Sequence, residues 1–96
     1  MTNGQLLQKA KTALRLRSAA FDDEILDILN AAQEDLATRG VVYTDITPMV
    51  LRAILTYTRM HFGQPDDYDK LKESYANQLG QLMTTTGYTR WDNGSE

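Results

Sequence analysis

The amino-acid sequence predicts an all-α fold, a single compact domain of four helices with a short C-terminal tail. Apolar residues recur at spacings of three and four in four segments, which is the period of a helix with one buried side. Three clear breaks separate these segments. Only one stretch is rich in β-branched and aromatic residues, and one strand without a second cannot make a sheet.

The first helix is expected from about Asn3 to Leu16. Arg15 and Arg17 lie near its C-terminal end, where the helix dipole favours positive charge. The apolar residues that share one side of this helix are Leu6, Leu7, Ala10, Ala13 and Leu14.

The second helix is expected from Asp22 to Arg39. Acidic residues occupy positions 22–24, in the first turn, where free N–H groups and the helix dipole favour negative charge. Asp35 and Arg39 form an acid-before-base pair at the i,i+4 spacing, and Gly40 supplies a left-handed stop. The apolar residues with helical period are Ile25, Ile28, Leu29, Ala32 and Leu36.

The third helix is expected from Pro48 to just before Gly63. An extended loop, Val41–Ile46, leads to its N-cap Thr47, and proline fits the first helical position. Nearly every face of this segment is apolar, so it is predicted to be buried nearly all round. It is either the central element of the domain or a helix shared between the core and a subunit interface. Its stripes are Val50, Ala53, Ile54, Tyr57 and Met60, then Leu51, Leu55 and Phe62, with a polar line of Arg52, Thr56 and Arg59.

The fourth helix is expected to start just after Pro65 and to end near Thr86, with Gly87 as its stop. Gly80 lies in its interior, which indicates close approach by another backbone or a bend. We expect residues 1–91 to form the helical domain and residues 92–96 a disordered tail. The inward stripe is Tyr68, Leu71, Tyr75, Leu79 and Leu82.

Composition excludes several classes of protein. The chain of 96 residues has no cysteine, which excludes a disulfide and a thiolate zinc site. No apolar run approaches a membrane span, and the N-terminal residues lack the apolar block of a signal peptide. We therefore expect the chain to stay in the cytoplasm where it is made. Because so small a core leaves a modest stability margin, self-association is the expected source of extra stability.

Motifs for catalysis are missing from the sequence. The single histidine, His61, lies in the apolar third segment, and the three serines at positions 18, 74 and 95 have no motif around them. The acidic clusters at 22–24 and 66–69 do not match a calcium loop and lie where helix starts favour acids. We predict that the protein is not an enzyme and uses no metal or cofactor.

Two kinds of binding remain open. A small helical DNA-binding or regulatory module would use the basic residues of the first helix against phosphates, although a net charge of -3 argues against phosphate-dependent binding. These residues are Lys9, Lys11, Arg15 and Arg17. The other kind is protein binding by Tyr88, Arg90 and Trp91, residue types that are enriched at interface hot spots. Alternatively, Trp91 folds back on its own helices.

Four segments, in this order and spacing, carry a likeness to a known family. They are Asp22-Asp23-Glu24-Ile25-Leu26-Asp27, Thr47-Pro48 with Ala53-Ile54, Phe62-Gly63-Gln64-Pro65-Asp66-Asp67-Tyr68-Asp69-Lys70-Leu71-Lys72, and Gln81-Leu82-Met83 through Thr86-Gly87-Tyr88-Thr89. From about Leu6 to Trp91, the chain resembles the head–tail connector proteins of tailed bacteriophages or prophages, also described as DNA-packaging or head-completion proteins.

The resemblance implies a structural subunit of the virion at the head–tail junction, assembled in the host cytoplasm. It implies a homo-oligomeric ring, a dodecamer, that docks on the portal protein and extends the DNA channel after packaging. A downstream connector or tail protein would dock on this ring. DNA would pass through without specific recognition, and no membrane or catalytic residue is implied. The partner-binding residues expected within the chain are Tyr88, Arg90 and Trp91.

Overall fold

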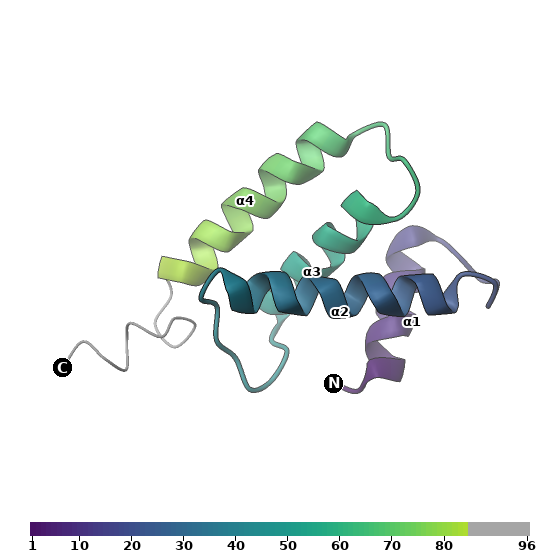
Figure 1. The fold of residues 1–96 in the computed structure, drawn as a ribbon, viewed down its shortest axis with the longest axis horizontal. Coiled ribbons are helices and arrows are strands. Elements are labelled where there is room, and N and C mark those ends of the chain that lie inside the picture. The colour runs from purple at the N-terminus through teal and green to yellow at the C-terminus, as the bar shows by residue number, and fades with distance from the viewer. Residues whose placement is uncertain (85–96) are drawn as a thin grey trace.

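The computed structural model describes residues 1–84, which form four α-helices joined by short loops (Figure 1). The predicted all-α fold is confirmed. The expected stop at Gly87 and the expected boundary between residues 1–91 and 92–96 lie outside the described residues. The helices are α1 (Asn3–Leu14), α2 (Asp22–Thr38), α3 (Pro48–His61) and α4 (Tyr68–Thr84).

Helix α3 is the centre of the fold, which was one of the two alternatives that its sequence left open. It packs on α1, α2 and α4, and it is the only one of the four described helices to contact all the others extensively. In Figure 1, α3 and α4 run antiparallel, and α2 crosses in front of α3. The fold is therefore built around one helix whose sequence is apolar on more than one side.

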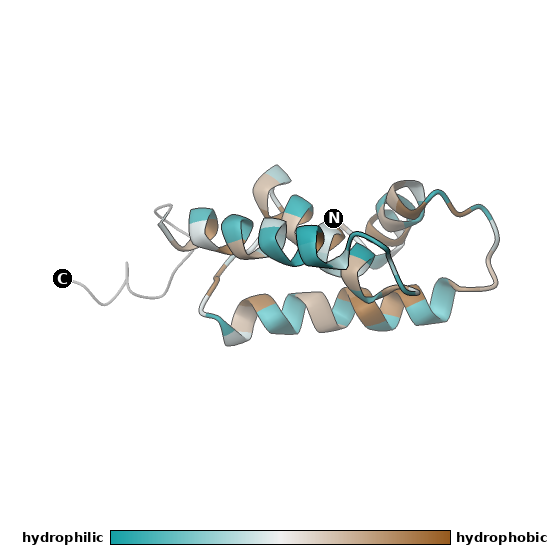
Figure 2. Ribbon diagram, turned by 90° about the horizontal axis from the view of Figure 1, so that it is seen from above, coloured by the Kyte–Doolittle hydropathy of each residue, from teal (hydrophilic) through white to brown (hydrophobic). Residues whose placement is uncertain are grey.

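The buried core draws on all four helices and on one loop residue. Figure 2 shows hydrophobic and hydrophilic stretches alternating along the helices, as expected when each helix has one buried side. Val41 is buried, so the predicted packing of the Val41–Ile46 loop against the helices is confirmed. The buried apolar residues of the helices are Leu6, Ala10, Ile25, Leu29, Ala32, Leu36, Val50, Ala53, Ile54, Met60, Leu71, Tyr75, Leu79 and Leu82.

Helix α1 ends two residues earlier than its sequence indicates. Arg15 adopts a left-handed conformation, with φ 60° and ψ 40°, and its N–H donates to the Lys11 and Thr12 carbonyl groups. The N–H of Leu16 also bonds to Lys11 O, at 2.9 Å, which closes the helix end. Glycine is the usual residue at such a position, and arginine there is strained. The apolar pattern extends past this point because Leu16 still packs on the core.

Helix α3 begins where the sequence predicts, whereas helix α4 begins later than predicted. Thr47 caps α3, its hydroxyl accepting from Val50 N, and Pro48 occupies the first helical position as predicted. Helix α4 begins at Tyr68 and not directly after Pro65, because Leu71 N donates to Asp67 O and so makes residue 67 the cap. The acidic residues at 66 and 67 therefore precede the first turn.

Gly80 has no close neighbour among the described residues. A Cβ atom built there would meet nothing within 4 Å. The expected close approach by another backbone is therefore wrong for residues 1–84. Glycine at this exposed helical position destabilises the helix, and no contact among the described residues offsets that loss.

Candidate assembly surface

One side of α3 is left partly open to solvent. Leu51, Leu55 and Phe62, the second apolar stripe of the sequence, are half-buried, whereas Val50, Ala53 and Ile54 are fully buried. The prediction that α3 is buried nearly all round is therefore wrong on this side, since α1 and the α3–α4 loop border the stripe without covering it. An apolar stripe of this kind suits a helix shared between a core and an interface.

A groove follows this open side. It has a volume of about 360 Å³ and is lined by Ala13 from the end of α1 and by α3 residues. A second hollow, of about 440 Å³, shares Ala13 and Arg59 with the first and continues to Phe62 and Pro65. We refer to these two neighbouring hollows together, the second of which also reaches Leu71 of α4, as the α3 groove. The α3 residues of the first hollow are Pro48, Leu51, Arg52, Leu55, Thr56 and Arg59.

The rim of the α3 groove is basic. Arg52, Arg59 and Arg15 are exposed along it. Asp67 is the acidic residue of the lining, and its carboxylate lies 3.8 Å from Arg59. Both side chains of this pair are about half exposed, at 48% and 49%, so the pair contributes little to stability. The rim keeps a positive balance although the whole chain carries a net charge of -3.

Thr56 departs from the expected polar line of α3. The sequence places it beside Arg52 and Arg59, but Thr56 is buried, and its hydroxyl donates to Arg52 O at 2.9 Å. A threonine can satisfy its hydroxyl within its own helix, so its burial leaves no unpaired polar group.

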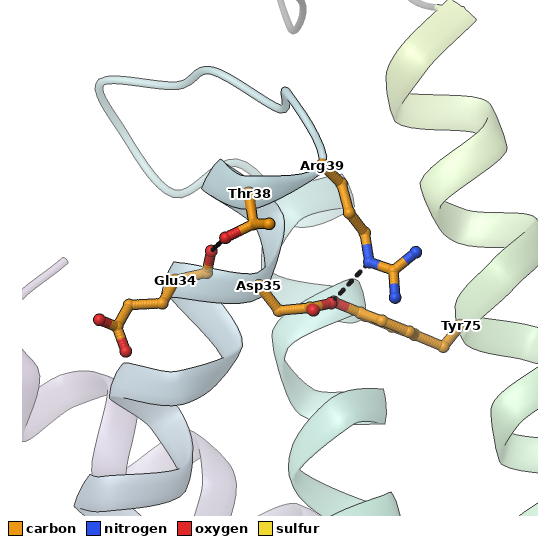
Figure 3. A network of polar contacts seen from close by, with 5 residues as sticks. All are labelled: Glu34, Asp35, Thr38, Arg39 and Tyr75. Carbon is orange, nitrogen blue, oxygen red and sulfur yellow. Dashed lines mark hydrogen bonds and ion pairs between the residues drawn. The ribbon is translucent and has the colours of Figure 1, made fainter.

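A polar network joins α2 to α4 away from the α3 groove. Asp35 Oδ2 accepts from the Tyr75 hydroxyl at 2.6 Å and from Arg39 Nε at 2.9 Å (Figure 3). The predicted Asp35–Arg39 pair is therefore confirmed, and Tyr75 adds a bond that crosses between helices. Burial and the Asp35 carboxylate raise the pKa of the Tyr75 hydroxyl above its ordinary value. Tyr57 packs edge-on against Tyr75, with ring centroids 5.5 Å apart.

The basic face of α1 is interrupted by an ion pair. Lys11 is buried, and its Nζ lies 2.9 Å from Asp22 Oδ1 at the start of α2. Lys9, Arg15 and Arg17 remain exposed. One of the four basic residues assigned to phosphate binding is therefore turned inward and neutralised, which weakens the case for a DNA-binding module.

The residues considered for catalysis are dispersed. His61 is exposed at the end of α3, and its ring packs on Tyr57 with centroids 4.3 Å apart. The Ser18 hydroxyl accepts from Ala20 N, as a turn residue does, and Ser74 is exposed on α4. Within residues 1–84, no three histidine or acidic side chains gather as a metal site would require. None of the helices described in residues 1–84 has the length and apolar character to cross a membrane.

The partner-binding residues expected from the sequence, Tyr88, Arg90 and Trp91, lie outside the described residues, as does the third serine, Ser95. The α3 groove, in contrast, was not assigned from the sequence. The second apolar stripe of α3 could have indicated it, because a helix that packs on the core with one side needs only one apolar stripe.

Comparison with known proteins identifies the family. The family model described as phage connector protein matches residues 6–89, well over half of the chain. A search of curated proteins and a search of solved structures each find no match. Connector proteins are structural components of the virion, which accords with a small helical domain that has an open apolar groove. On this match and this fold, the chain belongs to the phage connector protein family.

Proposed function

We propose that the chain is the structural subunit of a head–tail connector ring. The ring, of twelve copies as the resemblance implies, docks on the portal, extends the DNA channel and links head to tail after packaging. A downstream connector or tail protein binds its far side. The subunit acts in the host cytoplasm during assembly and then at the head–tail junction of the virion, and it catalyses no reaction.

The observation that carries this proposal is the half-buried apolar stripe on the central helix of a family member. A small domain without cysteine gains stability when such a stripe is covered by another subunit. The fold supports the stripe rigidly, because the opposite side of α3 is fully buried against α2 and α4. A rigid surface loses little conformational entropy on assembly.

Charge supports the proposed passage of DNA. A channel through which DNA slides must not hold phosphates strongly, and the chain has 13 acidic against 10 basic residues. We assign to Tyr88, Arg90 and Trp91 a contact with a partner in the connector assembly, in which the other copies of the chain are included.

The proposal is tested by removing the protein from the phage that encodes it. Infected cells should accumulate heads that contain DNA but carry no tails, as seen by electron microscopy, and the chain supplied from a plasmid should restore complete virions. Empty heads would instead place the protein at an earlier step of packaging. Normal virions in its absence would contradict a connector role.

A further inference from the structure

The α3 groove combines an apolar floor with a basic rim. Leu51 and Leu55 form the floor of the first hollow, and Arg52 and Arg59 stand beside them. The second hollow extends the floor to Phe62. A groove of this composition suits a short segment with an aromatic anchor and neighbouring carboxylates, because each would meet a group of complementary character.

The chain itself contains such a segment. Residues 85–96, beyond the described part, include the aromatic residues Tyr88 and Trp91. The same segment contains two acidic residues, Asp92 and Glu96, and one basic residue, Arg90. Twelve residues span up to about 40 Å when extended, more than the width of a helix pair. We propose that the α3 groove receives this C-terminal segment from a second copy of the chain, with Trp91 on the leucine floor and the acids at the arginine rim.

A ring gives the reason for a second copy. This inference rests on the proposed connector ring, in which every subunit contacts its neighbours head to tail. A head-to-tail interface needs two different surfaces on each subunit, one complementary to the other. The α3 groove and the C-terminal segment are such a pair, so each subunit would receive one segment and donate one.

The single tryptophan of the chain makes the contact measurable. Because Trp91 is the only tryptophan, its fluorescence reports on the segment alone. In the full-length protein, the emission should shift to shorter wavelength as the chain assembles, either with rising concentration or on portal rings. Arg52→Glu and Trp91→Ala should each weaken assembly by about tenfold or more, as expected for loss of an interface anchor.

Mixing two variants isolates the contact. The Arg52→Glu chain keeps its tryptophan but has a damaged groove, and the Trp91→Ala chain keeps its groove but has no tryptophan. Alone, each variant should assemble only weakly. Together they should form a complex of two chains by light scattering, with the blue shift of Trp91 emission. The exposed α4 residue Lys70 provides a matched charge reversal outside the groove, and Lys70→Glu should assemble as the unmodified chain does.

The outcomes separate this inference from the connector ring. If the unmodified chain assembles but the mixture shows neither complex nor shift, another surface joins the subunits and the inference fails while the ring stands. A blue-shifted Trp91 in monomers, unchanged on dilution, would show that Trp91 packs within its own chain and would overturn the inference. If the chain joins neither itself nor the portal, both proposals fail. Leu55→Glu, with its helix content checked by circular dichroism, provides a second groove variant.

Discussion

Replacing Tyr75 with phenylalanine removes one hydroxyl from the junction of α2 and α4. That hydroxyl donates to Asp35 Oδ2 at 2.6 Å, and the side chain of Tyr75 is otherwise packed in the core. Phenylalanine keeps the ring and therefore the apolar packing. The variant thus isolates the hydrogen bond from the burial of the ring.

The structure indicates how much stability Tyr75→Phe should lose. A hydrogen bond to a charged group contributes about 1.5 to 3 kcal/mol to stability. The Asp35 side chain is 25% exposed and keeps its bond to Arg39 Nε, so we expect the lower end, about 1.5 kcal/mol. For a domain of this size, that corresponds to a fall in Tm of about 6 to 12 °C.

Because the Tyr75 hydroxyl can ionise, the stability lost in Tyr75→Phe depends on pH. In the unfolded chain Tyr75 ionises near pH 10, whereas burial and Asp35 raise its pKa in the folded protein. The hydroxyl therefore contributes its full stability below pH 10 and loses it as the pH rises toward the folded pKa, by about 1.4 kcal/mol per pH unit. Phenylalanine has no such dependence, so the stability difference between the two proteins should shrink above pH 10.

Urea unfolding followed by circular dichroism measures both effects. Tyr75→Phe should lower the free energy of unfolding at pH 7, and the two stability curves should converge between pH 10 and 11. In an Asp35→Ala background the same substitution should have little effect, because the acceptor is gone. An equal loss in both backgrounds, or a constant difference across pH, would refute this account of the network.

Three further substitutions test the fold. Ile54→Ala, at the fully buried centre of α3, should lower the free energy of unfolding by about 2 to 5 kcal/mol in urea, and a smaller loss would place this side chain outside the core. Gly80→Ala should raise the free energy of unfolding by about 1 kcal/mol, since the added Cβ meets no described neighbour, and destabilisation would reveal a contact there. Arg15→Gly should raise Tm by a few degrees, because glycine adopts the left-handed conformation without strain, and a fall would mean that the arginine side chain stabilises the helix end.

Local patterns predicted much of the fold. The apolar spacing of Ile25, Leu29 and Leu36 correctly identified the buried side of α2, because helical periodicity needs no knowledge of distant residues. The Thr47 cap and the Asp35–Arg39 pair are confirmed for the same reason, since each involves residues within one turn. The end of α1 was misplaced because arginine rarely adopts the left-handed conformation found at residue 15.

Contacts between distant segments escaped prediction. Tyr75 and Asp35 are 40 residues apart, and nothing in either local sequence indicates that they meet. Lys11 was assigned to a basic surface, yet the crossing of α1 and α2 brings it to Asp22. The α3 groove also depends on how the helices pack, because the sequence shows two apolar stripes on α3 but not which one its neighbours leave open.

The central claim is that this chain assembles as a connector on the portal. Multi-angle light scattering of the full-length protein across concentration, alone and with purified portal rings of the same phage, tests it most directly. The account predicts a closed oligomer near twelve copies, or a monomer that joins each portal ring in a fixed ratio. A monomer or dimer that never associates with the portal at any concentration would contradict it.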